Sequence, residues 1–332
     1  MDGVATPESL SKIAWICAAA AACALAGQAS ASCGSIFCPV NTNWDVQGNP
    51  LPTGARIDLR YAYGEQKDLR SGTDKVSPDD VDLDEIEQET LNRNLFATFD
   101  YTLSQTWGLS VQAPLMDRSH SHVVSDSGEE ESWQFDALGD VRVLARHRFA
   151  PGPAWTWGVG AGLKLPTASF DEANDEGAVA ERSLQPGTGT TDAVVSVSGN
   201  RQALIHEHPS AWFVEAQAQH AFNERSGYEP GGQLVLDAGL TFGATPKLNL
   251  LVQTNVLFKE HDRGEEAEPE DTGGTFAFLS PGFAYAVNND ISFYAFLQVP
   301  LYQDVDGVQL TADTAFSLGF NYRFRAASGS AP

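Results

Sequence analysis

Charged side chains recur at every second position in several segments that are otherwise rich in apolar residues. Arg56, Asp58 and Arg60 alternate with Ile57 and Leu59, and alternation along a β-strand places the two sets on opposite faces. Charges of both signs on the inner face of a barrel either line a wet channel or pair into ladders that close it. The pattern predicts a lumen-lining, solute-binding set that consists of Arg56, Asp58, Arg60, Asp100, Arg142, Arg146, Lys164, Asp192, Glu215 and Asp237.

Two cysteines near the start of the chain offer a covalent link or a metal site. Cys33 and Cys38 remain after removal of the expected leader, and in an oxidising compartment we expect them to form a disulfide. The alternative is a copper, zinc or redox site. His206 and His208 could add borderline ligands to such a site, and a strand-based barrel would place them on the same side as the cysteines.

A second candidate metal site is an acidic stretch. Asp80, Asp82 and Asp84 supply oxygen ligands in the manner of a calcium loop, although the glycine of such loops is missing. The alternative is a solvated acidic loop. His120 and His122 are expected on another outer loop and favour a metal less strongly.

Composition and charge exclude several classes of function. The chain has 332 residues and a net charge of −24, which argues against binding nucleic acid or a polybasic membrane contact. We find no Ser-His-Asp spacing, phosphate-binding loop or metalloprotease helix in the sequence. We therefore expect no enzymatic activity and no cofactor.

Strand-like alternation from residue 55 onward must position the charged side chains. In the last segment, Ala315–Phe324, alternate residues such as Phe316 and Leu318 make one face wholly apolar, which suits a wall that faces lipid. Twelve such segments occur, an even number as in bacterial barrels. We predict an all-β fold, a single transmembrane antiparallel β-barrel of about 12 strands. The last segment also resembles the carboxy-terminal assembly signal of such barrels through Gly319, Tyr322 and Phe324.

The connections between these segments alternate in length. Long loops, such as Arg118–Trp133, follow the odd strands, and short turns follow most even strands; the longer Asn200–Ser210 is the exception. Because short turns face the periplasm in bacterial barrels, both termini are expected there. The short turns are Ser104–Thr106, Ala150–Ala154, Ala244–Lys247 and Asn288–Asp290.

In one segment the apolar residues shift from even-numbered to odd-numbered positions. Phe276 and Phe278 occupy even positions, whereas Phe283 and Tyr285 occupy odd ones. One inserted residue would produce this change, so we predict a β-bulge near Ser280–Gly282.

The chain divides into four parts. The apolar run Ile13–Ala26 is followed by Ala29-Ser30-Ala31, which predicts a signal peptide over residues 1–31; a lipidated Cys33 is the alternative. Residues 32–53 form a periplasmic segment that could enter the lumen as a plug, anchored by Trp44, Val46 and Leu51, or remain a mobile tail. The barrel is expected over residues 54–324, and a short periplasmic tail over 325–332.

Several short motifs resemble a family of outer-membrane proteins described as transporters or as "meta-pathway of phenol degradation" proteins. The resemblance covers roughly residues 55–324 and implies a barrel that moves small, often hydrophobic compounds, with no catalytic residue to carry over. The motifs are Leu138-Gly139-Asp140-Val141 through Phe149, Leu163-Lys164-Leu165-Pro166-Thr167, Leu184-Gln185-Pro186-Gly187-Thr188-Gly189, Leu279-Ser280-Pro281-Gly282, and Leu297-Gln298-Val299-Pro300-Leu301-Tyr302 through Phe324.

Together these observations predict a channel of the bacterial outer membrane that moves small solutes passively, including hydrophobic or aromatic ones. Its expected partners are outer-membrane lipid and lipopolysaccharide, the barrel-assembly machinery and the solute. Two alternatives stay open. One is a non-conducting barrel that acts as a scaffold or adhesion protein, and the other is a metal- or redox-linked partner of a periplasmic complex.

Overall fold

The computed structural model describes residues 40–51, 53–149 and 155–325. Within these ranges no helix is both long enough and apolar enough to cross a membrane. Two short 3-10 turns, η1 (Pro78–Asp80) and η2 (Pro269–Asp271), interrupt an otherwise all-β chain. The strands are β1 (Gly54–Gly72), β2 (Asp74–Lys75), β3 (Glu85–Thr102), β4 (Trp107–Val124), β5 (Glu129–Leu138), β6 (Val141–Arg148), β7 (Thr156–Leu165), β8 (Asp192–Ile205), β9 (His208–Ala221), β10 (Gln233–Gly243), β11 (Leu248–Lys259), β12 (Gly274–Ala286) and β13 (Ile291–Arg325).

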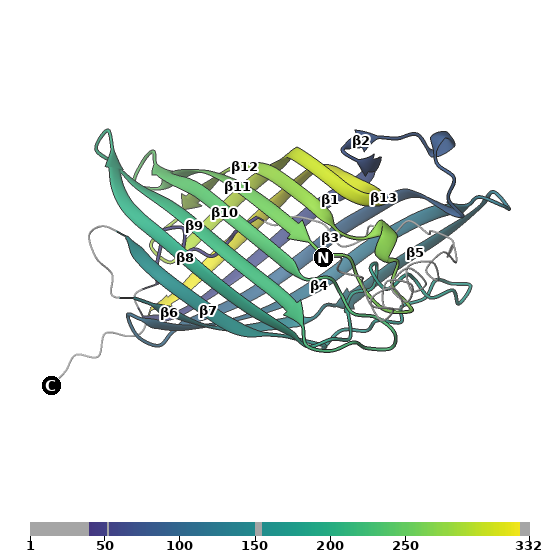
Figure 1. The fold of residues 1–332 in the computed structure, drawn as a ribbon. Helices are drawn as coiled ribbons and strands as arrows, with labels where there is room; N and C mark the ends of the chain where they lie inside the picture. Colours follow the sequence, from purple (N-terminus) through teal and green to yellow (C-terminus); the bar gives the residue numbers. More distant parts are fainter. Residues whose placement is uncertain (1–39, 52, 150–154, 326–332) are drawn as a thin grey trace, which may run out of the picture.

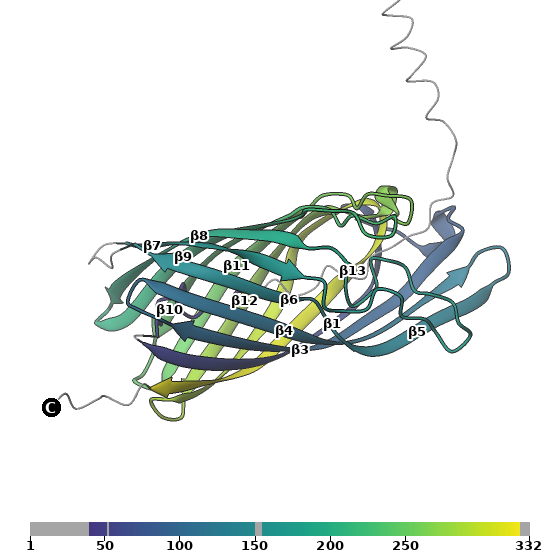
Figure 2. The same ribbon diagram turned by 90° about the horizontal axis from the view of Figure 1, so that it is seen from below.

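The strands form one closed antiparallel barrel (Figures 1 and 2). The ring runs β13-β12-β11-β10-β9-β8-β7-β6-β4-β3-β1, and pairing of β1 with β13 closes it. Strand β13 is 35 residues long and pairs with β12 through its first part and with β1 through its second. It reverses near Gly307, whose φ of 65° suits a turn. The eleven strands of the ring, with β13 counted twice, give twelve passes of the chain, which confirms the predicted barrel.

Side chains alternate between the two faces of this wall. Outward-facing Trp212 is 48% exposed and Phe283 is 45% exposed, whereas inward-facing Asn255 and Ser280 are fully buried. A wall that is apolar outside and polar inside suits a barrel that spans lipid.

The predicted bulge near Ser280–Gly282 is wrong. The pairing of β11 with β12 runs through these residues without a shift, and the irregularity against β13 lies between Ala277 and Phe278. Phe276 and Phe278 face inward, where they pack in one cluster with Leu257 and Val305. The strand therefore alternates regularly between its two faces. The sequence suggested a shift only because apolar side chains lie on both faces.

Two expected connections are also wrong. The predicted loop Arg118–Trp133 is mostly strand, because β4 continues to Val124 and β5 begins at Glu129. The predicted long connection Asn200–Ser210 is a two-residue turn, since β8 ends at Ile205 and β9 begins at His208. His206 and Glu207 have φ values of 47° and 68°, as tight hairpins of right-handed twist require. Ala150–Ala154 lies outside the described residues.

Strands β5 and β6 share one partner. Both pair with β4, which meets β6 over Trp107–Gln112 and β5 over Leu115–Val124. Gly139 and Asp140 separate them, and β5 has no other strand partner in the described chain. Its inner face instead meets the connection between β7 and β8, here called loop 166–191.

Candidate functional site

The predicted lumen residues line the inside of the barrel, which has two unlike ends. We call the end with the turns 103–106, 244–247 and 287–290 the turn end, and the opposite end the loop end. Arg56, Asp58 and Asp100 lie near the turn end, and Lys164 and Asp192 near the loop end. Each of these side chains is at least nine-tenths buried and faces away from lipid.

Residues 40–51, here called the inner segment, lie inside the barrel at the turn end. Val40, Trp44 and Leu51 are each no more than 5% exposed. The Trp44 ring meets the Tyr294 ring edge-on at 4.8 Å. Its Nε1 donates to Asp58 Oδ2 at 3.0 Å, and Asp58 Oδ1 accepts from the Tyr294 hydroxyl at 2.7 Å. One carboxylate on β1 therefore orients two aromatic side chains.

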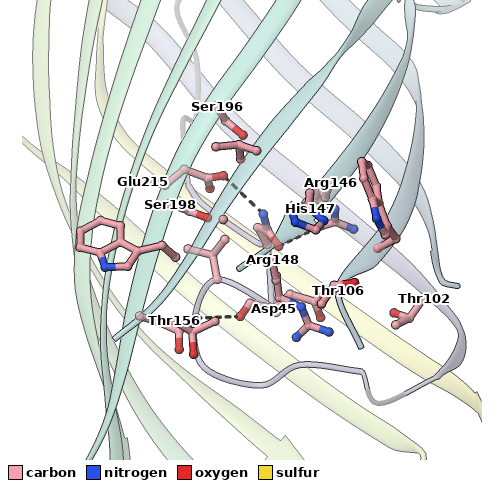
Figure 3. Close-up of a pocket in the computed structure, with 18 residues that line it drawn as sticks. Asp45, Thr102, Thr106, Arg146, His147, Arg148, Thr156, Ser196, Ser198 and Glu215 are labelled. Carbon is pink, nitrogen blue, oxygen red and sulfur yellow. Dashed lines mark hydrogen bonds between the residues drawn. The ribbon is translucent and has the colours of Figure 1, made fainter. Parts of the chain in front are cut away.

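A cationic network fixes the middle of the inner segment. Arg56 Nη2 lies 2.6 Å from Asp45 Oδ1, and Arg56 Nε lies 3.4 Å from Asp100 Oδ2. Arg146 also pairs with Asp100 and donates to Asn43 Oδ1 at 2.8 Å. Figure 3 shows Asp45 of the segment and Arg146 of the wall. A small cavity of about 40 Å³ lies between Asn43 and Asp45 of the inner segment and the wall at Arg146.

Amide groups of the inner segment satisfy two buried acids. Asn41 Nδ2 donates to Glu215 Oε2 at 2.6 Å and to Asp237 Oδ2 at 2.8 Å. Asn255 Nδ2 donates to the other Asp237 oxygen at 2.6 Å. Arg60 Nη1 donates to the Val40 carbonyl at 2.9 Å. The neutral donors on the segment thus match the acids on the wall.

A larger cavity of about 440 Å³ lies between the inner segment and the loop end. Residues 40–43 contribute its floor, and residues 182, 183 and 185–188 of loop 166–191 contribute its far side. Arg142 faces it and has no ion pair with any described residue. The wall is mixed in character, with charged groups such as Arg60, Arg142, Lys164 and Glu215 beside apolar Phe96, Pro114, Met116, Leu144, Val235 and Leu257.

Buried ionic contacts hold loop 166–191 at the loop end. Lys164 Nζ lies 2.9 Å from Asp140 Oδ2 and 3.2 Å from Asp192 Oδ1, and it also donates to Thr188. Asp140 accepts from the Thr188 backbone N–H at 3.2 Å. Arg118 donates to the Leu184 carbonyl on the same loop. Lys164, predicted to bind solute, is thus also a structural anchor of the loop.

A second connection packs beside that loop. The Arg182 guanidinium lies 4.8 Å from the Tyr228 ring centroid. The Tyr228 hydroxyl donates to Asp262 Oδ2 at 2.8 Å. Burial, followed by the neighbouring Asp262 charge, raises the pKa of Tyr228 well above its usual value. The hydroxyl therefore stays a protonated donor at neutral pH.

The metal candidates from sequence lie apart from one another. Asp80 ends η1 and Asp82 follows it, and both are exposed at the loop end. His206, on a turn, and His208, the first residue of β9, are exposed at the other end. Asp84 is half-buried. Cys33 and Cys38 lie outside the described residues, as does the predicted signal peptide.

The residues of the predicted assembly signal lie in the returning part of β13. A Cβ added at Gly319 would come within 1.9 Å of Tyr294 Cζ, so this glycine makes room for the ring that bonds Asp58. The Tyr322 and Phe324 rings meet edge-on at 4.6 Å.

Sequence reasoning missed the inner-segment partners Asn41, Asn43 and Asp45. They follow no strand period, and Asn41 and Asn43 carry no charge, so no pattern in the sequence indicated them. Asp140 and Thr188 were missed as anchors, although both lie within the short motifs Leu138–Val141 and Leu184–Gly189.

Comparison with known proteins places this barrel in a family. Residues 94–324 match the family model described as "Putative MetA-pathway of phenol degradation". The chain belongs to this family. The match spans eleven of the twelve passes, from within β3 to Phe324 in β13. No curated protein sequence matches the chain.

Several solved structures align with this family member, and the first of them shares its barrel. An outer membrane channel from Pseudomonas putida F1 aligns with a TM-score of 0.64 and 14% identity, covering 86% of this chain and all of that one. A mutant of a monoaromatic hydrocarbon channel aligns with a TM-score of 0.41 and 8% identity, and the alignment covers 82% of this chain and 91% of that one. A NanC porin aligns with a TM-score of 0.44 and 11% identity, and the alignment covers 81% of this chain and all of that one. The fold is that of an outer-membrane β-barrel.

Proposed function

We propose that this protein is a channel through which small solutes, including hydrophobic or aromatic ones, cross the bacterial outer membrane passively. The observation that carries this proposal is the 440 Å³ cavity inside the barrel, between the inner segment and loop 166–191. Pockets of about 300–1,000 Å³ are typical of small-molecule sites. The turn end, where β13 ends at Arg325, faces the periplasm in this proposal.

The lining of the cavity suggests how a solute is held. Phe96, Met116 and Leu257 offer apolar surface, and beside it Arg142 offers a cation that forms no ion pair within the described residues. A solute with an apolar ring and a polar or anionic substituent satisfies both. No nucleotide or catalytic group takes part, since diffusion down a gradient needs neither.

Passage toward the turn end requires the inner segment to give way. Its contacts with Arg56, Asp58, Asp237 and Glu215 cross the route that a solute leaving the cavity would take. We therefore expect a narrow conductance in the full mature chain and a larger one when the segment is absent.

The test is planar-bilayer recording of the refolded mature chain and of a variant that lacks residues 40–51. We expect small discrete steps from the full chain and steps several-fold larger from the deletion. Pro50→Ala, at an exposed position of the same segment, is the matched control and should behave like the full chain. Silence of both chains after verified insertion would contradict the channel and favour the scaffold alternative.

A further inference from the structure

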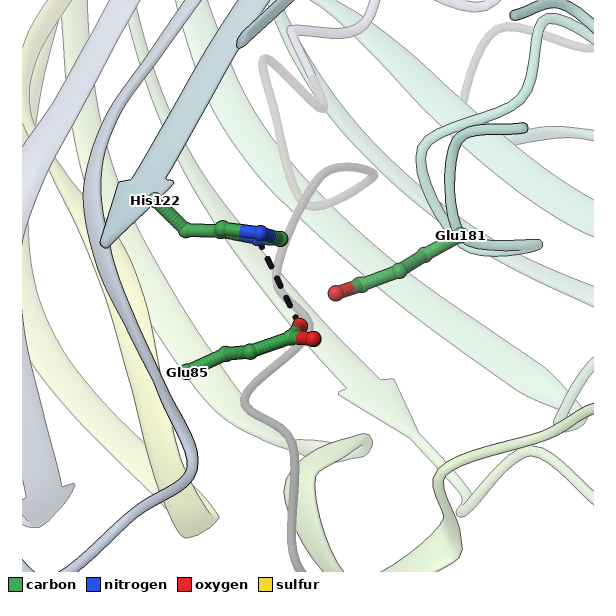
Figure 4. A group of neighbouring side chains, drawn as sticks. All are labelled: Glu85, His122 and Glu181. Atoms are coloured by element: carbon green, nitrogen blue, oxygen red, sulfur yellow. Dashed lines mark ion pairs between the residues drawn. The ribbon is translucent and has the colours of Figure 1, made fainter. Parts of the chain in front are cut away.

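Three potential metal ligands converge at the loop end, outside the cavity contacts described above. Glu85 begins β3, His122 lies near the end of β4, and Glu181 belongs to loop 166–191. One ligand atom from each lies within 4.8 Å of the other two. Figure 4 shows Glu181 reaching toward the other two side chains from the opposite side. Two wall strands and one loop thus contribute to a single cluster.

His122 is buried in an unusual state. Its side chain is only 3% exposed, and neither ring nitrogen makes a hydrogen bond within the described chain. Nδ1 lies 3.5 Å from Glu85 Oε2, and Nε2 lies 3.8 Å from Glu131 Oε2. A buried polar group without a hydrogen bond costs free energy, so this ring is arranged for a partner that lies between it and the carboxylates.

We propose that Glu85, His122 and Glu181 bind one divalent transition-metal ion of the zinc class. Zinc takes imidazole nitrogen and carboxylate oxygen at about 2.0–2.2 Å, and tetrahedral geometry then puts neighbouring ligands about 3.4 Å apart. The separation of His122 Nδ1 from Glu85 Oε2 already has nearly this value. Calcium fits less well, because it takes about 6–8 oxygen ligands.

A third carboxylate, that of Glu131, lies where it can orient the His122 ring. Metal-binding imidazoles usually donate the other ring N–H to a carboxylate or carbonyl. Glu131 faces His122 across the β4–β5 pair and lies nearest to Nε2. The Trp133 ring packs edge-on against His122 at 5.0 Å and limits its rotation. Nδ1 is therefore the metal-binding nitrogen.

The ion would fasten loop 166–191 to the barrel wall. The loop is already held on both sides of Glu181, where Trp133 Nε1 donates to the Ala178 carbonyl at 2.9 Å and Arg118 donates to the Leu184 carbonyl. Because residues 182, 183 and 185–188 of this loop line the cavity, the metal would control access to it. That consequence rests on the proposed channel, whereas metal binding does not.

The test is calorimetric titration of Zn²⁺ into the folded mature chain in detergent, with its thiols alkylated so that Cys33 and Cys38 cannot contribute. We expect one ion per chain. His122→Gln and Glu181→Gln should each weaken binding more than tenfold, and Glu131→Gln about 10–100-fold. Two control variants should leave Zn²⁺ binding unchanged. His220→Gln alters an exposed histidine of β9, and Glu176→Gln alters an exposed acid of loop 166–191.

Two further readouts do not depend on conduction. Co²⁺ should give the visible absorption of a tetrahedral site in the wild-type chain and lose it in His122→Gln. Zn²⁺ should slow tryptic cleavage after Arg182 in the wild-type chain but not in Glu181→Gln. Excess Ca²⁺ should not displace the bound Zn²⁺. Absence of saturable 1:1 binding, or equal binding by the wild-type chain and the ligand variants, would overturn the proposal.

Discussion

The two halves of the lumen use buried charge in different ways. At the turn end, Arg56 joins Asp100 on the wall to Asp45 on the inner segment, beside a cavity of about 40 Å³. At the loop end, Lys164 joins Asp140 and Asp192 beside a cavity of about 440 Å³. The first cation ties a segment across the lumen, whereas the second ties a loop to the wall.

This difference shows that buried ion pairs alone do not decide whether a barrel is open. What matters is whether the partner belongs to a segment inside the lumen or to the wall and its loops. A buried ion pair is weak evidence for stability, but loss of one partner is costly because the other charge stays buried. Removing each cation in turn therefore separates the two roles.

The largest effect is expected for Arg56→Met. The Arg56 side chain is fully buried, and its loss leaves Asp45 and Asp100 without their shared cation. We expect a loss of about 3–5 kcal/mol in the free energy of unfolding, measured by urea denaturation in detergent. Single-channel conductance should rise, because Asp45 no longer holds the inner segment.

Arg93→Met is the matched control for burial. Arg93 pairs with Asp117 at 2.7 Å, but both side chains are 31% exposed. Partly exposed pairs contribute about 0–1 kcal/mol, so this variant should be nearly as stable as the wild-type chain and should conduct like it. Equal losses in the two variants would show that burial of Arg56 in the network has no special role.

A smaller effect is expected for Lys164→Met at the loop end. Asp192 keeps its hydrogen bonds from Thr190 and Gln219, and Asp140 keeps those from backbone N–H groups of loop 166–191. The expected loss is about 1–3 kcal/mol. Tryptic cleavage after Arg182 should become faster, because the loop is held less firmly. If conductance rose more in Lys164→Met than in Arg56→Met, the loop end, and not the inner segment, would limit conduction.

Much of the barrel could be predicted from the alternation of side chains. Strand β7, for example, presents Trp157, Val159, Ala161 and Leu163 outward and Thr156, three glycines and Lys164 inward, so the number and direction of such strands could be predicted from the sequence. The prediction failed where inward positions are apolar, as at Phe276 and Phe278, and where strands extend outside the closed ring, as at Glu129–Leu138. Period two is the same in lipid and in a protruding sheet, so it cannot mark where the bilayer ends.

The charged lumen residues could be named from parity, but their partners could not. Arg56 and Arg146 follow the strand period, whereas Asn41, Asn43 and Asp45 lie in a segment without one. Their positions depend on tertiary contacts with four or more strands. For the same reason His122 could be seen in the sequence, but its meeting with Glu85 and Glu181 could not.

The smallest effect on stability, and the sharpest test of the cavity, is expected for Arg142→Gln. Arg142 lines the cavity and forms no ion pair with the part of the chain that the structure describes, so its loss should change the free energy of unfolding by no more than about 0.5 kcal/mol. Its positive charge nevertheless acts on any solute there. Reversal potentials in a salt gradient should shift toward cation selectivity, since an unpaired cation that attracts anions is lost. Strong destabilisation with unchanged selectivity would mean that Arg142 supports the wall and does not face the solute.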